Sequence, residues 1–439
     1  MNIKNKILEK LLLPIADLLI GSSFISKLRE LRRECLLTED ELILLQKEKL
    51  QKLLRYSINN KKYYSSLKVQ LNEKELDIKK FPIVDKQILF DKQDSLLSQP
   101  KNKLIKNASS GSTGQQSIVY WSKEEQSINR ATQILWWEWS GYRFGDPILQ
   151  TGITPNRGFV KYIKDKLLNT YYLQAFTHSK EDVLKALRWA QQQEAPILAG
   201  YASSLYVIAK YAIEENIKVE FKAAVSWGDK LFDHYKKTIY TAFGVNVCET
   251  YGSAEGLMMG GQKDLDNMYL MSSNVFIEIV DDKGNDVKDG ELGHVLVTNL
   301  NGYAMPLIRY RIGDLAIKMP QNEYPINREY GFPIWKKIIG RDTDLVITES
   351  GKYLVVHSFT GVFEHIPEIK QFCVIQNSKK GIIIQFIKGQ NFSKNILEKA
   401  KNIILGYVNE PFDIVFIEVN FIPPTKSGKP QLIISNLNK

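Results

Sequence analysis

The sequence predicts an α/β protein with a large multi-layer N-terminal domain, partly β-rich, and a small mobile α+β C-terminal domain. Its 439 residues exceed what one hydrophobic core usually serves, so two domains are the simplest expectation. Helical spacing alternates with short apolar runs as far as residue 250, which is typical of a layered α/β domain. Strand patterns dominate after residue 274. We therefore expect domains at 1–340 and 341–439, with the boundary within 339–344.

Apolar spacing and capping signals predict the helices. Thr38 and Glu41 form a capping box, and leucines recur behind it at helical spacing, so residues 38–67 are expected to be helical. Residues 188–190 and 206–213 are expected to lie in helices of the layered region, and residues 393–408 in a helix of the C-terminal domain.

Runs of β-branched and aromatic residues predict the strands. In the larger domain, strands are expected at 117–121 and 245–248, and at 275–280 and 294–300 on either side of the turn sequence DDKGN. In the smaller domain, residues 345–348 and 352–356 form a predicted hairpin around Ser350 and Gly351, and further strands are expected at 381–387 and 414–421.

The first 33 residues contain an apolar run, LLLPIADLLI at 11–20, followed by the basic run SKLRELRR at 26–33. The apolar run is about half the ~20 residues that a membrane span needs, and no clear signal-peptide cleavage site follows it. Two interpretations stay open. The segment is either an interfacial helix on an anionic membrane or, as we favour, a helix packed on the protein's own surface.

Composition excludes several classes of protein. The formal net charge is +10, but lysine is spread along the chain and no basic block stands out, so a nucleic-acid partner is not expected. Cys35, Cys248 and Cys373 lie far apart and form neither a disulfide framework nor a zinc motif. A cytoplasmic protein is expected, with contact at the inner face of the membrane left open.

Two short motifs carry residue types suited to phosphate and purine binding. Residues 108–114 read ASSGSTG, in which small residues let backbone N–H groups converge and hydroxyls add donors. Residues 249–256 read ETYGSAEG, where Tyr251 beside a glycine offers a face for a purine and Glu255 offers an oxygen ligand for Mg²⁺. Taken singly, the first is more often a flexible loop, and the second a turn at which Glu255 begins a helix.

Three further motifs follow. Residues 309–314 read RYRIGD, whose aspartate suits hydrogen bonds from both ribose hydroxyls, although a surface turn would give the same letters. Residues 340–344 read GRDTD at the expected domain boundary. Residues 425–429 read TKSGK, in which Lys429 or its rival Lys426 can supply a point charge.

In this order and at these spacings, the five motifs resemble the adenylate-forming superfamily of acyl-CoA synthetases. Within it, the chain is most similar to phenylacetate–CoA ligase-like proteins of the CapK type, which are associated with capsular polysaccharide biosynthesis. Further stretches fit that group over nearly the whole chain: FPIVDK at 81–86, GYRFGD at 141–146, GYASSL at 200–205 and MPLIRYRIGDLA at 305–316.

The resemblance implies that a substrate carboxylate attacks the α-phosphate of ATP, after which the acyl group passes to an acceptor. It implies that Glu255 binds Mg²⁺, that Asp314 and Arg341 hold the ribose, and that Lys429 reaches the α-phosphate as the catalytic lysine. The residues implied to hold the terminal phosphates are Ser109, Ser110, Gly111, Ser112, Thr113 and Gly114. Those implied around the adenine are Trp227, Gly228, Asp229, Glu249, Thr250, Tyr251, Gly252 and Ser253.

The sequence departs from the family pattern at Ala254, where a threonine or serine is usual, so one hydroxyl near the α-phosphate is missing. Some relatives carry a Cys/His zinc site after this motif. Here the region holds Met258, Met259, Gln262 and Asp266, so no zinc is expected. The acceptor is coenzyme A or an amine on a sugar or amino acid, and the sequence does not separate the two.

Two alternatives remain. The protein could be a nucleotide-binding scaffold of a polysaccharide assembly complex without turnover, which Ala254 favours and the other motif residues oppose. Separately, Trp136, Trp137, Trp139 and Tyr142 could line an aryl pocket, but a helix that packs its tryptophans into the core is the favoured interpretation.

Overall fold

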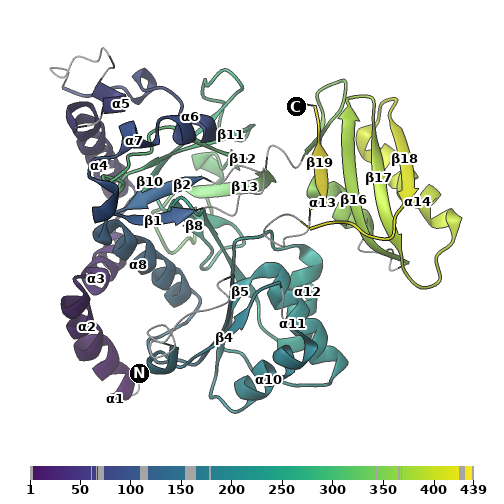
Figure 1. Ribbon diagram of the computed structural model, residues 1–439, viewed down its shortest axis with the longest axis horizontal. Coiled ribbons are helices and arrows are strands. Elements are labelled where there is room, and N and C mark those ends of the chain that lie inside the picture. Colours follow the sequence, from purple (N-terminus) through teal and green to yellow (C-terminus); the bar gives the residue numbers. More distant parts are fainter. Residues whose placement is uncertain are drawn as a thin grey trace. The chain divides into compact units, whose positions relative to one another are not determined.

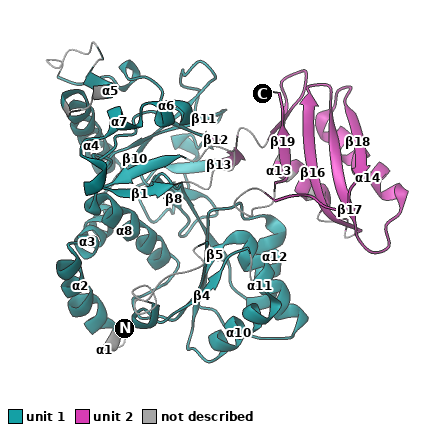
Figure 2. Ribbon diagram, in the orientation of Figure 1, with its two compact units in different colours: residues 1–312, 317–337 teal, residues 313–316, 338–439 magenta. Residues whose placement is uncertain are grey.

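The structure is a computed structural model, and it forms two compact units (Figure 2). It describes residues 3–60, 62–65, 67, 74–108, 117–153, 165–176, 179–341, 345–363, 366, 368–424 and 431–437. The first unit comprises residues 1–312 and 317–337, and the second comprises 313–316 and 338–439. The second unit thus begins three residues before the expected boundary and takes in a short segment of the RYRIGD region, which the sequence did not suggest.

Helices dominate the first 65 residues of the first unit (Figure 1). They are α1 (Ile3–Ile7), the π-helical turn η1 (Leu8–Leu12), α2 (Leu13–Ile20), α3 (Phe24–Glu34), α4 (Glu39–Asn60) and α5 (Lys62–Ser65). The predicted capping box is confirmed, because the Thr38 N–H donates to Glu41 (2.8 Å) and the Glu41 N–H donates to the Thr38 hydroxyl (3.3 Å). Among the described helices, none is long and apolar enough to span a bilayer.

One mixed sheet organises the first unit, with the strand order β10-β11-β12-β13-β9-β8-β7-β6-β5-β3-β4 in the described part of the chain. Its strands are β3 (Ile148–Gly152), β4 (Thr170–Gln174), β5 (Ile197–Tyr201), β6 (Ala223–Trp227), β7 (Val247–Gly252), β8 (Met258–Gly261), β9 (Met268–Leu270), β10 (Val275–Val280), β11 (Leu292–Asn299), β12 (Tyr310–Lys318) and β13 (Ile334–Arg341). The predicted pairing of 275–280 with 294–300 is confirmed as the antiparallel ladder β10–β11.

Side chains of the parallel strands alternate between two cores. Ile148, Ile197 and Val225 point toward α3 and α8 (Lys123–Trp139), whereas Leu149 and Leu198 point toward the opposite face. The helices on that opposite face are α10 (Lys180–Gln191), α11 (Ala202–Glu214) and α12 (Asp233–Phe243). A layer of helices therefore covers each face of the parallel strands, as expected for a layered α/β domain.

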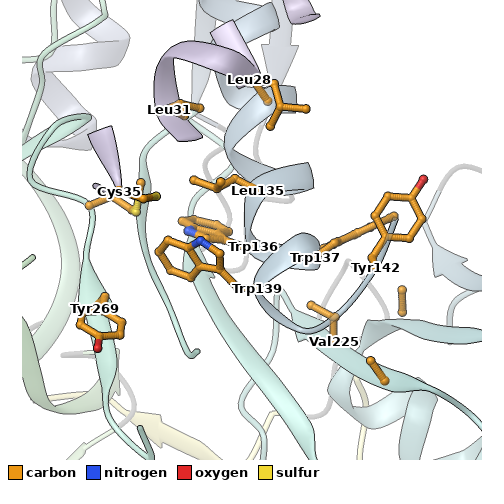
Figure 3. Packing of buried hydrophobic residues seen from close by; sticks show 14 of the residues in the cluster. Leu28, Leu31, Cys35, Leu135, Trp136, Trp137, Trp139, Tyr142, Val225 and Tyr269 are labelled. Atoms are coloured by element: carbon orange, nitrogen blue, oxygen red, sulfur yellow. The ribbon is translucent and has the colours of Figure 1, made fainter. Parts of the chain in front are cut away.

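The aromatic residues of α8 belong to the core between this helix, α3 and the sheet (Figure 3). Trp136, Trp137, Trp139 and Tyr142 are all buried. Ser122 and Glu125 form the capping box that starts α8. The favoured interpretation of these tryptophans as core residues is confirmed.

Short elements complete the first unit. They are η2 (Ile78–Lys80), α6 (Lys86–Asp91), α7 (Gln93–Leu96), η3 (Lys101–Lys103), β1 (Ile105–Ala108), β2 (Ile118–Trp121) and η4 (Gln321–Glu323). Strands β1 and β2 pair antiparallel, with Ala108 opposite Ile118.

The second unit is a small α+β domain. Strands β16 (Ile369–Ser378), β17 (Gly381–Lys388), β18 (Asp413–Glu418) and β19 (Ile433–Ser435) form a sheet in the order β18-β17-β16-β19. Its core includes apolar residues of α13 (Val356–Phe363) and α14 (Lys394–Val408). The predicted hairpin is confirmed as β14 (Leu345–Ile347) paired antiparallel with β15 (Tyr353–Val355).

Candidate active site

The candidate site of the first unit lies where the sheet changes from parallel to antiparallel. Strand β7 is parallel to β6, with Ser226 opposite Glu249, and antiparallel to β8 on its other side. The segments 227–229 and 250–252 therefore leave the carboxyl ends of two neighbouring parallel strands. Ligands of open α/β sheets bind at such edges.

The segment after β6 is fixed by local contacts. Both carboxylate oxygens of Asp229 accept hydrogen bonds at the start of α11, from the N–H groups of Ala202 (2.6 Å) and Ser203 (3.1 Å) and from the Ser203 hydroxyl (2.5 Å). Gly228 has φ +80°, and a Cβ there would clash with the Tyr201 ring, so glycine is required. Asp229 thus caps a helix, and its implied role at the adenine stays a prediction.

Trp227 ends β6 with its ring stacked on Trp137, at a centroid distance of 5.7 Å and an interplanar angle of 16°. The Thr250 hydroxyl donates to the Ser226 carbonyl at 2.9 Å, which ties β7 to β6 beside it. These contacts hold both strand ends in register.

Glu249 lies next to this junction with an unusual carboxyl group. Desolvation raises its pKa, and nearby Asp229 acts in the same direction, whereas Lys236 and Lys230 oppose the shift. Its backbone N–H donates to the Gln262 side chain at 2.8 Å.

The ring of Tyr251 packs edge-to-face on Trp335 of β13, at a centroid distance of 5.9 Å and an angle of 80°. Beyond it, Gly252 and Ser253 enter a tight turn in which the Ser253 N–H donates to the Leu257 carbonyl at 3.0 Å. The chain then continues as β8, so the alternative in which Glu255 begins a helix is wrong.

Glu255 is buried within this turn and held by two residues to which the sequence assigned no role. The Tyr310 hydroxyl donates to Glu255 Oε1 at 3.3 Å, and Trp121 Nε1 donates to the Glu255 carbonyl at 3.2 Å. Gly256 has φ +83°, and a Cβ there would lie 2.8 Å from the Trp121 ring. A larger residue would therefore push the β2 strand off the turn.

Asn107 links the same turn to β1. Its Nδ2 donates to the Ala254 carbonyl at 2.5 Å. Asn107 directly precedes the ASSGSTG motif in the sequence, and this bond places the described end of β1 beside the turn that carries Glu255. The position of Asn107 directly before the ASSGSTG motif could have suggested a role for it. Nothing in the sequence pattern indicated that its partner is Ala254.

In the second unit, Asp314 and Arg341 form an ion pair, with Arg341 Nε 3.1 Å from Asp314 Oδ1. The two residues come from strands β12 and β13. Asp314 is buried, whereas the Arg341 side chain is partly exposed, so this charged pair can present an arginine edge to a ligand.

Several predicted residues lie outside the described part of the chain. They are Ser109, Ser110, Gly111, Ser112, Thr113, Gly114, Lys426 and Lys429. Among the described residues there is no group of three or more His, Cys, Asp or Glu side chains that could hold a metal ion. A single buried carboxylate such as Glu255 still suits Mg²⁺, which commonly takes one or two protein carboxylates alongside water and substrate phosphates.

Comparison with solved structures decides the fold. The chain superposes on 2-hydroxyisobutyryl-CoA ligase in its postadenylation state with a TM-score of 0.71 and 16% identity, covering 92% of each chain. It has the fold of the adenylate-forming ligases. The amide bond synthetase McbA from Marinactinospora thermotolerans shares this fold, with a TM-score of 0.54 and 16% identity over 75% of this chain and 68% of that one.

Sequence relatives of this adenylate-forming ligase fold point to the same group. Residues 346–436 match the CapK C-terminal domain family. Protein CapK from Staphylococcus aureus is 25% identical over 421 residues, or 92% of this chain and 91% of the relative. Phenylacetate-coenzyme A ligase from Pseudomonas putida is 24% identical over 314 residues, covering 67% of each chain. The resemblance of the sequence to CapK and to phenylacetate–CoA ligases is thus confirmed.

Proposed function

We propose that the protein is an AMP-forming ligase that activates a carboxylic acid with ATP and passes the acyl group to an acceptor. The observation that carries the proposal is the turn at 253–256. Tyr310 and Trp121 hold Glu255 there, and Asn107, which directly precedes the ASSGSTG motif in the sequence, is hydrogen-bonded to the same turn. A buried acidic ligand near the proposed phosphate-binding loop would suit adenylation.

Two displacements make up the reaction. In the first, a carboxylate oxygen of the acid bonds to the α-phosphorus of ATP, and the bond between the α- and β-phosphates breaks to release pyrophosphate. In the second, the nucleophilic atom of the acceptor attacks the acyl carbonyl carbon and AMP leaves. Both steps depend on alignment and charge stabilisation, so the protein's task is to position groups.

The residues of the site divide this task. The loop 109–114 would hold the β- and γ-phosphates, and the segments 227–229 and 249–253 would surround the adenine. Asp314 and Arg341 would hold the ribose. Glu255 would ligate Mg²⁺, which supplies positive charge to the phosphate oxygens when bound. Lys429 would approach the α-phosphate from the C-terminal domain of residues 341–439, while residues 1–340 bind ATP and the acid.

Similarity to Protein CapK supports a role in capsular or surface polysaccharide biosynthesis. The acceptor is an amine on a sugar or amino acid, or coenzyme A. Amide formation draws support from McbA, an amide bond synthetase with this fold, and thioester formation from the phenylacetate–CoA ligases. We place the reaction in the cytoplasm.

ATP–pyrophosphate exchange across a panel of carboxylic acids, including sugar acids and amino acids, tests the proposal. Acid-dependent incorporation of labelled pyrophosphate into ATP is expected with at least one acid. Measurable ATP binding without exchange for any acid would instead favour a scaffold without turnover. Ala254 is the motif residue that supports this alternative, because it lacks the usual hydroxyl. Supplying coenzyme A or amines to the active mixture then identifies the acceptor by the product formed.

A further inference from the structure

The outward face of the N-terminal helices consists of large apolar side chains. Leu11, Ile15, Leu18 and Leu19 are spaced i, i+4, i+7 and i+8, which puts them on one side of the helix. Their exposed fractions run from 46% for Ile15 to 83% for Leu18. Ile7 and Leu12 border the same side, with exposed fractions of 47% and 48%. We call the set Ile7, Leu11, Leu12, Ile15, Leu18 and Leu19 the apolar face.

Polar contacts fix the orientation of this segment on the rest of the first unit. Glu9 pairs with Arg32 of α3 at 2.7 Å, and Arg32 also pairs with Glu138 of α8. Asp17 Oδ2 accepts the Ile25 N–H at 2.7 Å. Leu13 packs against the core, on the same side as Glu9 and Asp17, because the three are four residues apart. The segment is thus held by one side, and the apolar face points away from it.

The segment packs on the protein's own surface, as the favoured interpretation expected, through the side that carries Glu9, Leu13 and Asp17. The apolar face is the other side of the segment. Single exposed leucines are common on protein surfaces. A continuous row of them on one helix face indicates a surface that contacts a membrane or another protein.

Charges around the apolar face favour an anionic partner. The exposed charged residues described between 5 and 33 are Lys6, Lys10, Arg29, Glu30 and Arg33, four basic and one acidic. Lys6 and Lys10 are four residues apart, as are Arg29 and Arg33, so each pair lies along one side of its helix. An apolar row on a segment whose exposed charges are mostly basic is the composition of a helix that lies in the headgroup region of an anionic bilayer.

We infer that α2 and the preceding turn form a peripheral docking surface for anionic lipid membranes. Leucine side chains of the apolar face enter the boundary between headgroups and acyl chains, and the basic residues contact lipid phosphates. The helix lies in the plane of the surface and does not cross it. The inference does not depend on adenylation, since no residue of the apolar face belongs to the candidate active site.

Co-sedimentation of the full-length protein with vesicles tests this. The probe is vesicles of phosphatidylcholine and phosphatidylglycerol in equal parts, compared with vesicles of phosphatidylcholine alone. Binding to the anionic vesicles that weakens with added salt is expected. The Leu18→Ser/Leu19→Ser variant should lower the partition coefficient about 100-fold, since burying each leucine contributes roughly a tenfold gain. Lys6→Gln/Lys10→Gln should lower it about tenfold on anionic vesicles and little on neutral ones.

A matched control replaces exposed apolar residues on other helices. Ile213→Ser/Ile403→Ser alters side chains that are 47% and 45% exposed on α11 and α14, and it should bind vesicles like the wild type. Equal thermal unfolding of all variants verifies that they are folded. Absence of vesicle binding by the wild type, or undiminished binding by the leucine variant, overturns the inference. So does light scattering that shows a wild-type dimer dissociated by the leucine variant, because the face then binds a second copy.

Discussion

Tyr310 on β12 donates a hydrogen bond from its hydroxyl to Oε1 of Glu255, in the turn between β7 and β8, at 3.3 Å. The two residues are 55 positions apart in the chain, and both are buried. Because Glu255 is the proposed magnesium ligand, this bond would fix which carboxylate oxygen faces the metal. Hydrogen bonds to metal ligands commonly have this orienting effect.

Replacing Tyr310 with phenylalanine should therefore raise the Mg²⁺ concentration needed for half-maximal pyrophosphate exchange by about tenfold, the value of one hydrogen bond to a charged group. Tyr64→Phe is a matched control, because the Tyr64 hydroxyl is also buried and donates to a carbonyl, that of Pro306, at 3.1 Å. That variant should lose stability without any change in magnesium dependence. Equal magnesium dependence in the two variants would contradict the assigned role of Tyr310.

Glu255→Gln should reduce exchange by at least about 100-fold while leaving the turn intact, since glutamine still accepts from Tyr310 but carries no charge for a cation. Glu125→Gln provides the comparison, because Glu125 is a buried glutamate of α8 that accepts from the Ala304 N–H at 2.7 Å. Exchange should persist in the Glu125 variant. Comparable loss in both variants would indicate that a buried charge matters for folding and not for the metal.

The raised pKa of Glu249 predicts how stability depends on pH. A carboxyl group whose folded-state pKa lies above its unfolded value contributes stability below the unfolded pKa and loses it as pH rises through the folded pKa. The side chain of the Glu249→Gln variant stays neutral at every pH. The unfolding temperature of the variant relative to that of the wild type should therefore rise by about a few degrees between pH 4 and pH 8.

Glu41 provides the opposite case for the same experiment. Hydrogen bonds from Thr38 lower the pKa of the Glu41 carboxyl. Its contribution is present above the unfolded pKa and is lost as pH falls through the folded pKa. Glu41→Gln should therefore be less stable than the wild type near pH 7 and approach it in acid. Parallel pH profiles for the two variants would show that the environment of Glu249 is not the one described.

The extent to which the sequence predicts this molecule depends on the range of each interaction. The Thr38–Glu41 capping box and the buried face of α8 follow from neighbours a few residues apart, and the β10–β11 pair joins two apolar runs across one turn sequence, so local patterns predict all three. The contact of Asn107 with Ala254 joins residues 147 positions apart. No local pattern encodes such a partner, because it depends on how the separate β1–β2 pair packs beside the turn between β7 and β8.

Site residues show the same division. The motifs indicated Glu255, Asp314 and Arg341 by residue type, but the partners that hold them come from tertiary structure. The Asp314–Arg341 pair arises because β12 and β13, which are consecutive in the chain, are also neighbours in the sheet. Asp229 also has a tertiary partner that the sequence did not indicate, since its carboxylate caps α11, while the contact with adenine that the resemblance implies stays a prediction.

Asp314→Asn should raise the KM for ATP by about tenfold or more, because a ribose hydroxyl would lose a charged acceptor and Arg341 its partner. The penalty should shrink with 3′-deoxy-ATP, which lacks one of the hydroxyls that the carboxylate would accept. Glu323→Gln breaks the Glu323–Lys336 pair at the surface, and its KM for ATP should stay at the wild-type value. A similar penalty for ATP and 3′-deoxy-ATP would exclude a ribose contact by Asp314.

Lys429→Ala tests the remaining assignment, which rests on the sequence because Lys429 lies outside the described residues. A positive charge that offsets the developing negative charge at the α-phosphate acts in the first displacement and has no part in the second. The rate of acid-dependent pyrophosphate release by the variant should therefore fall about 100-fold or more. This is the effect expected from losing one charge contact in the transition state. It should still transfer the acyl group from chemically prepared acyl-AMP to the acceptor. Lys426→Ala removes the neighbouring lysine of the same motif and should leave both steps near wild type. Near-normal pyrophosphate release by the Lys429 variant, or a loss confined to Lys426→Ala, would move the role to another residue.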